Sequence, residues 1–170
     1  MQVARELKPT LTPPDQMLLS KLLGMFEALT AAYPDRPRGL IHSDLFRDNT
    51  LFVGNQLTGI LDFYEMNHDE LLFDVAISIN DFCTEYPSLE LNEDKAIAFL
   101  TAYDAIRRLT DDERACLEIY LAMAAGRFWL MRLRVAAKNS ELGLSSADIL
   151  HKNPNEMRNM LIDRLKFVTA

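Results

Sequence analysis

The chain has 170 residues, of which 49% are hydrophobic and 25% are charged, and its formal net charge is −7. This balance is ordinary for a globular protein and excludes a disordered chain, and the length suits one domain over residues 1–170. The apolar runs are shorter than the ~20 residues of a membrane span, and an acidic chain lacks the basic stripe of a nucleic-acid binder. No signal-peptide pattern opens the chain. We therefore expect a cytoplasmic protein with neither a nucleic-acid nor a membrane partner.

Helix signals occupy both ends of the chain. Thr12 is a typical N-cap with Pro13 at the first helical position, and apolar residues then recur at helical spacing until Tyr33-Pro34. After residue 69 the helical period returns. Four further helices are predicted: 70–83, 92–108 capped by Asn92, 110–138 opened by the capping box Thr110–Glu113, and 153–167 opened by Asn153-Pro154. Residues 140–146 are the clearest predicted loop.

The segment between these helices has a different pattern. Short apolar stretches at 51–53 and 57–63 flank the turn signal Gly54-Asn55, which predicts a β-hairpin. So few strands cannot form a parallel sheet. The sequence therefore predicts an α+β fold that is mostly helical and has one small hairpin region.

The two cysteines carry little functional signal. Cys83 and Cys116 lie in predicted helices, and the chain has no C-x-x-C motif and only three histidines. We therefore expect neither a disulfide framework nor a zinc site. We expect both cysteines to be buried or half-buried free thiols.

The hairpin region holds the residues that point to chemistry. Asp44 precedes Asn49 by five positions, and Asp62 lies at the end of the second predicted strand. A hairpin of this length folds back, so Asp62 is expected beside Asn49. Hard oxygen ligands of this kind suit Mg²⁺, and a further carboxylate nearby is what phosphoryl transfer requires of its base.

These residues match the kinase pattern H-x-D-x-x-x-x-N followed by Asp-Phe, from His42 to Asn49 and at Asp62-Phe63. The segment resembles the catalytic loop of the aminoglycoside phosphotransferase and choline kinase superfamily, which has a protein-kinase-like fold. Within that superfamily, the run Asp-Leu-Phe-Arg-Asp-Asn over 44–49 is similar to the homoserine kinase branch. The resemblance implies ATP as co-substrate, Mg²⁺ as cofactor and phosphoryl transfer to L-homoserine in threonine biosynthesis.

The resemblance also implies a role for each matching residue. Asp44 becomes the catalytic base, and Asn49 and Asp62 become the Mg²⁺ ligands. His42 is expected to pack beneath the base and to support the loop. Asp74, in the first turn of a predicted helix, is expected to brace the loop from behind, although a carboxylate there is also favoured simply by the helix dipole.

Three arginines are weaker candidates for binding a phosphate or a substrate carboxylate. Arg47 follows the base by three positions, and Arg127 and Arg132 lie on the predicted helix 110–138. A guanidinium is suited to either anion. The alternative for each is a salt bridge with the acidic remainder of the chain.

The family pattern is incomplete in this sequence. A kinase of this type also has an N-terminal lobe with a glycine-rich loop and a lysine for the nucleotide phosphates, and residues 1–38 show neither. The chain is therefore expected to correspond to the C-terminal lobe alone, to bind ATP weakly, to turn over little and to self-associate through an exposed apolar face.

Three alternatives remain open from the sequence. The acceptor could be an aminoglycoside or a choline-like compound instead of homoserine. The chain could also be a non-catalytic, kinase-like binding module. A helical interaction domain with an incidental motif is the third alternative.

Overall fold

The computed structural model describes residues 2–143 and 152–168. The helices are α1 (Gln2–Leu7), η1 (Lys8–Thr10), α2 (Pro13–Ala32), η2 (Arg47–Asn49), η3 (Phe63–Glu65), α3 (Leu71–Phe82), α4 (Glu93–Ile106), α5 (Asp111–Glu141) and α6 (Pro154–Arg164). The strands are β1 (Arg38–Ile41), β2 (Thr50–Val53), β3 (Gln56–Ile60) and β4 (Asn67–Glu70). The described residues are thus mostly helical with two small antiparallel sheets, which confirms the predicted α+β class.

The predicted caps define the helix starts. Thr12 accepts a hydrogen bond from the backbone N–H of Asp15, and Thr110 and Glu113 form both halves of the predicted capping box. Asn92 and Asn153 cap α4 and α6. The ends were less well predicted, because α5 continues to Glu141 and includes the first residues of the predicted loop. Residues 144–146 of that loop lie outside the described residues.

The sheets contain one expected and one unexpected pairing. β2 and β3 form the predicted hairpin around Gly54, whose φ of 59° suits glycine in a tight turn. The second predicted strand extended to Phe63, but β3 ends at Ile60 because the backbone turns into the left-handed region at Asp62. The pairing of β1 with β4 and the short helix α1 were not predicted.

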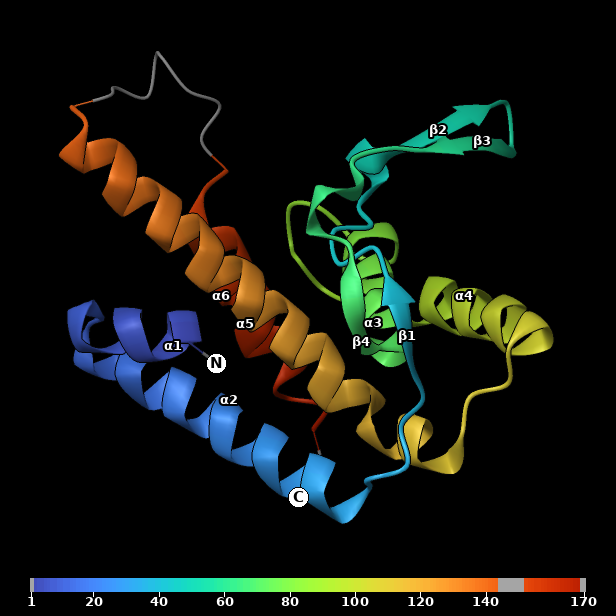
Figure 1. Cartoon of the computed structure of the whole chain (residues 1–170), viewed down its shortest axis with the longest axis horizontal. Helices are drawn as coiled ribbons and strands as arrows, with labels where there is room; N and C mark the ends of the chain where they lie inside the picture. The colour runs from blue at the N-terminus through green and yellow to red at the C-terminus, as the bar shows by residue number, and fades with distance from the viewer. Residues whose placement is uncertain (1, 144–151, 169–170) are drawn as a thin grey trace.

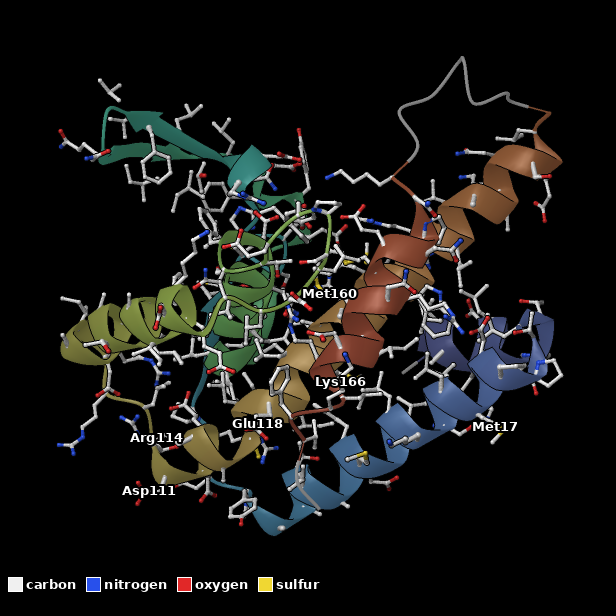
Figure 2. All side chains as sticks on the ribbon, turned by 180° about the vertical axis from the view of Figure 1, so that it is seen from behind. Met17, Asp111, Arg114, Glu118, Met160 and Lys166 are labelled. Atoms are coloured by element: carbon white, nitrogen blue, oxygen red, sulfur yellow. The ribbon has the colours of Figure 1, made fainter. Side chains whose placement is uncertain are left out.

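Helix α5 is the centre of the molecule. In Figure 1 it runs diagonally between α1 and α2 on one side and α3 with β1 and β4 on the other. Figure 2, which views the molecule from behind, shows α6 lying across α5. The close approach of α2 requires Gly126, since a Cβ there would lie 2.5 Å from a methyl carbon of Leu22. No helix among the described residues combines the length and apolar character needed to cross a membrane.

The hydrophobic core lies where α2, α3, α5 and α6 meet. Its largest fully buried apolar side chains include Trp129, Tyr120, Leu22, Ile77 and Met160. Cys83 and Cys116 are buried free thiols within this core, as predicted. The β2–β3 hairpin lies outside the core and projects away from the helices (Figure 1).

Candidate active site

Asp74 holds the turn that precedes Asp44. Strand β1 ends at Ile41, and Asp74 in the first turn of α3 accepts hydrogen bonds from the backbone N–H groups of His42 (2.6 Å) and Ser43 (2.7 Å). Ser43 is buried and has a φ of 66°, an unfavourable conformation for a residue with a Cβ. Two charge-assisted hydrogen bonds to one carboxylate offset that cost.

The same face of α3 continues along the loop. Ser78 donates a long hydrogen bond to the backbone oxygen of Leu45 (3.5 Å). Asp81 accepts from the backbone N–H of Arg47 (2.6 Å) and from its Nε (3.1 Å). Because Asp74, Ser78 and Asp81 are spaced at i, i+4 and i+7, they lie on one face of the helix. Helix α3 therefore fixes the loop from His42 to Arg47 by bonds to its backbone.

Asp44 is half-buried beside Asn49. The side-chain nitrogen of Asn49 donates to Asp44 Oδ2 (3.1 Å) and to the backbone oxygen of Asp44 (2.8 Å). Burial raises the pKa of the Asp44 carboxyl above its ordinary value of 3.8, and the nearby charge of Asp62 adds to this rise. The Asn49 hydrogen bond and the positive charges of Lys152 and Arg127 act in the opposite direction. Asp44 therefore holds protons more strongly than an exposed aspartate.

The hairpin brings Asp62 to the same place. Strand β2 begins directly after Asn49, and Thr50 pairs with Ile60 across the hairpin. The ladder continues by one bond, because the N–H of Leu61 donates to the backbone oxygen of Asn49 (2.9 Å). Asp62 follows Leu61 in a turn with a φ of 63° and is exposed. The predicted juxtaposition of Asn49 and Asp62 is present, although Asp62 lies in a turn and not at a strand end.

His42 connects the two loops. It is buried, and its Nδ1 accepts from the backbone N–H of Asp44 (3.3 Å). Its Nε2 therefore carries the proton and donates to the backbone oxygen of Leu61 (2.8 Å), and its ring lies 4.8 Å from that of Phe63. The imidazole thus spans the segments that carry Asp44 and Asp62.

Arg127 contacts both loops from α5. Its Nη1 donates to the backbone oxygen of Ser43 (2.7 Å), and its Nη2 lies 3.5 Å from Glu65. The guanidinium also lies over the rings of Phe73 and Phe128. The ion pair with Glu65 corresponds to the salt-bridge alternative for this residue.

The other two arginines are placed differently. The Arg47 side chain forms an ion pair with Asp81 and lies over the Tyr86 ring, which corresponds to the salt-bridge alternative. Arg132 donates through Nη1 to the backbone oxygen of Asn153 (3.0 Å) and forms an ion pair with Glu156 Oε2 (3.2 Å), so the salt-bridge alternative is present for this residue too. Only Arg132 among the three lines a cavity together with Asp44.

Two cavities adjoin the loop. One of about 290 Å³ is lined by Asp44, Arg132 and Lys152, among others. A larger one of about 550 Å³ lies between α2, α5 and the β1–β4 sheet, with Ser43 and Arg127 in its wall. Three residues at the site were not among the predicted site residues: Lys152, Asp81 and Glu65. Each is far along the chain from its partner at the site, so no local pattern could have revealed the contact.

The oxygen donors available at the site suit Mg²⁺. Because Asn49 uses its side-chain nitrogen on Asp44, its side-chain oxygen Oδ1 is left without a partner among the described residues. The Asp62 carboxylate likewise accepts no hydrogen bond from residues 2–143 or 152–168. Within these ranges no group of three or more His, Cys, Asp or Glu could hold a metal ion. One carboxylate and one amide oxygen are a sufficient protein contribution for Mg²⁺, which keeps several waters and binds substrate phosphates.

Comparison with known proteins gives consistent matches. The model of the phosphotransferase enzyme family matches residues 2–109, which include Asp44, Asn49, Asp62 and Asp74. The homoserine kinase of Polaromonas naphthalenivorans is 45% identical over 106 residues, which are 62% of this chain and 34% of that protein. The homoserine kinase of Methylobacillus flagellatus is 50% identical over 97 residues, 57% of this chain and 30% of that protein.

A longer match covers α5 and α6 as well. The homoserine kinase of Pseudomonas aeruginosa (strain LESB58) is 36% identical over 164 residues, which are 96% of this chain and 50% of that protein. The chain thus spans about a third to a half of the length of these curated relatives. Since the family model matches well over half of the chain, the protein belongs to the phosphotransferase enzyme family.

Proposed function

We propose that this chain carries the phosphoryl-transfer site of an ATP-dependent kinase for a small hydroxyl compound, with L-homoserine as the favoured acceptor. One observation carries the proposal. The side chain of Asn49 donates to Asp44, and the backbone oxygen of Asn49 accepts from the N–H of Leu61, the residue before Asp62. The names of the relatives support homoserine as the acceptor. The chain would correspond to the C-terminal lobe of a kinase-like fold, and the complete nucleotide site would include residues beyond it.

In this proposal Asp44 is the base. Its carboxylate accepts the proton of the acceptor hydroxyl as that oxygen forms a bond to the γ-phosphorus of ATP, and the bond from that phosphorus to the ADP oxygen breaks. Asn49 positions Asp44 by donating to Oδ2, and burial gives Asp44 a raised affinity for the proton. His42 and Asp74 support the loop and touch no reacting atom.

Asn49 and Asp62 are proposed as the protein ligands of Mg²⁺. When bound, Mg²⁺ supplies positive charge that neutralises the phosphate oxygens of the nucleotide. The left-handed turn at Asp62 leaves its carboxylate exposed and without a protein partner among the described residues, so it is available to a cation.

Binding of Mn²⁺ tests the metal half of the proposal. We expect electron paramagnetic resonance to detect Mn²⁺ bound to the chain, with Mn²⁺ in the place of Mg²⁺, beyond the amount that the same concentration of ATP binds without the chain. Asp62→Asn keeps a side chain that tolerates the left-handed backbone but removes the charge, and should weaken this binding at least about tenfold. Asp69→Asn makes the same change of residue in strand β4 and is the matched control. Equal Mn²⁺ binding by wild type and Asp62→Asn would refute the assignment.

A further inference from the structure

The cavity beside Asp44 has the size and the walls of a binding site for a small metabolite. Its volume is about 290 Å³, slightly below the roughly 300–1,000 Å³ typical of sites for drug-sized ligands. Phe46 and Phe128 supply apolar surface, and their rings meet edge to face at 4.7 Å. Asp44 lies in the wall, so a ligand in this cavity meets the proposed base.

The charges that line the cavity are unequal. Its described lining contains one carboxylate, that of Asp44, and two cations, Arg132 and Lys152. In the proposed function Asp44 must face the hydroxyl of the acceptor, so it cannot also neutralise a cationic group on the same molecule. Both cations already form an ion pair within the protein, Arg132 with Glu156 (3.2 Å) and Lys152 with Asp48 (3.2 Å). An anionic group on the ligand would therefore be bound by the N–H donors that these pairs leave unused.

Arg132 is held in place with part of its guanidinium unused. Its two hydrogen bonds, to Asn153 and Glu156 at the start of α6, both use Nη1. Nε and Nη2 donate to no described residue. The side chain is only 13% exposed, so its position is largely fixed before any ligand binds. A pre-positioned planar donor of this kind suits a carboxylate.

Lys152 adds a second, weaker attraction for an anion. Its ion pair with Asp48 (3.2 Å) is exposed on both sides, and such pairs contribute little to stability. Its Nζ lies 5.6 Å from the centre of the Phe46 ring. A quaternary ammonium compound that bound against the Phe46 ring would therefore meet the ammonium group of Lys152, which carries the same charge.

Arg127, the alternative cation on α5, is less suited to a ligand carboxylate. It donates to the Ser43 backbone, lies beside Glu65 and packs over two aromatic rings. Its Nη1 and Nη2 both face a protein partner, whereas the two bonds of Arg132 both use Nη1, so Arg127 has fewer donors to offer a ligand. Arg134, a further cation on α5, lines only the larger cavity.

We propose that the cavity beside Asp44 binds the acceptor through its carboxylate, held by Arg132 and Lys152, and so selects small hydroxy acids, amino acids included, over cationic hydroxyl compounds. The inference rests on the proposed function, because it takes Asp44 as the group that faces the acceptor hydroxyl. It names a carboxylate subsite and disfavours the aminoglycoside and choline alternatives.

Calorimetric titration of the 170-residue chain tests the subsite without requiring turnover. The probes are L-homoserine, L-homoserine amide, in which a neutral amide replaces the carboxylate, and choline. We expect L-homoserine to bind about tenfold more tightly than its amide, because a neutral amide cannot form the charge-assisted hydrogen bonds of a carboxylate. Choline should show no measurable binding.

Charge-removing variants locate the subsite. Arg132→Gln should weaken L-homoserine binding about tenfold, and the exposed Lys152→Gln about threefold, with the affinity for the amide unchanged. Arg134→Gln removes the same charge from the same helix outside this cavity and should leave both affinities unchanged. Should Arg132→Gln fail to fold, as judged by circular dichroism, Lys152→Gln decides the question.

Several results would overturn the subsite. These are equal affinity for L-homoserine and its amide, a loss of affinity in Arg134→Gln but not in the cavity variants, or no binding of L-homoserine by the folded chain. Normal Mn²⁺ binding alongside any of these results would leave the proposed phosphoryl-transfer function standing. Absence of Mn²⁺ binding together with the expected L-homoserine binding would instead refute the proposed metal site and leave the carboxylate subsite standing.

Discussion

The two segments that supply the candidate site are held in different ways. Residues 42–47, which contain Asp44, are bonded to the face of α3 formed by Asp74, Ser78 and Asp81, and to Arg127 on α5. The hairpin that leads to Asp62 projects from the helices, and its apolar residues Phe52 and Val53 are 52% and 71% exposed. One segment is built on the core and the other on its own hairpin.

This difference corresponds to different demands of the proposed chemistry. A base must be held within a few tenths of an ångström of the proton it accepts, so a loop tied to a buried helix is suitable. A ligand for Mg²⁺ completes its coordination with waters and phosphate oxygens and needs an open position. His42 is the link, because it bonds to the backbone of both segments.

The largest effect on stability is expected at Asp74. Asp74→Ala leaves the N–H groups of His42 and Ser43 without their acceptor, and should lower the free energy of unfolding by about 3 kcal/mol. Urea unfolding measures this change. Asp94→Ala, also in the first turn of a helix but exposed, should cost less than about 0.5 kcal/mol. Equal costs would mean that Asp74 acts only on the helix dipole.

A smaller effect is expected at Asp81, and it separates the two interpretations of Arg47. Asp81→Ala removes both the backbone and the side-chain bond and should cost about 1–2 kcal/mol of unfolding free energy. Arg47→Ala keeps the backbone bond and should cost less than about 1 kcal/mol. If Arg47 instead binds phosphate, Arg47→Ala would weaken ATP binding while Asp81→Ala would not.

The pH dependence of transfer is a more subtle test of the Asp44 loop. Because the pKa of Asp44 is raised and a base must be ionised, activity should fall as the pH drops through that raised value. Lys152 lowers the pKa of Asp44, so Lys152→Gln should move the acid limb of the profile to higher pH, whereas Lys152→Arg should not. If Lys152→Gln leaves the acid limb of the pH profile unchanged, a group other than Asp44 controls that limb.

The smallest effect on stability is expected in the hairpin. Phe52→Ser and Val53→Thr alter exposed side chains and should change the free energy of unfolding by less than about 0.5 kcal/mol. They should nevertheless reduce self-association of the chain, which light scattering measures, because exposed apolar patches promote contacts between copies. A monomeric wild-type chain at high concentration would contradict the second expectation.

Local signals predicted much of the fold. Thr12, Asn92, Thr110 and Asn153 each act where their residue types predicted, because a cap depends on a hydrogen bond within the next three residues. Strand β4 was missed because Asn67-His-Asp-Glu70 has no apolar alternation, and only its pairing with β1 makes it a strand.

The site was predictable to the extent that its residues lie in one short segment. Asp44, Asn49 and Asp62 come together through a hairpin whose turn the sequence marks with Gly54-Asn55. Lys152 and Asp81 could not be predicted, since they reach the loop through tertiary packing. The bonds that engage Arg127 and Arg47 depend on packing in the same way.

The most direct measurement of the central claim is phosphoryl transfer in Asp44→Asn. The vehicle is a chimera in which this chain replaces the matched half of the Pseudomonas aeruginosa homoserine kinase, assayed with L-homoserine and Mg²⁺–ATP. Because burial disfavours the charged form of Asp44, the variant should be at least as stable as the parent at neutral pH. We predict a fall in kcat of about 10²–10⁴, with Asp48→Asn in the same loop within about threefold of the parent. Transfer at the parental rate by Asp44→Asn would contradict the account.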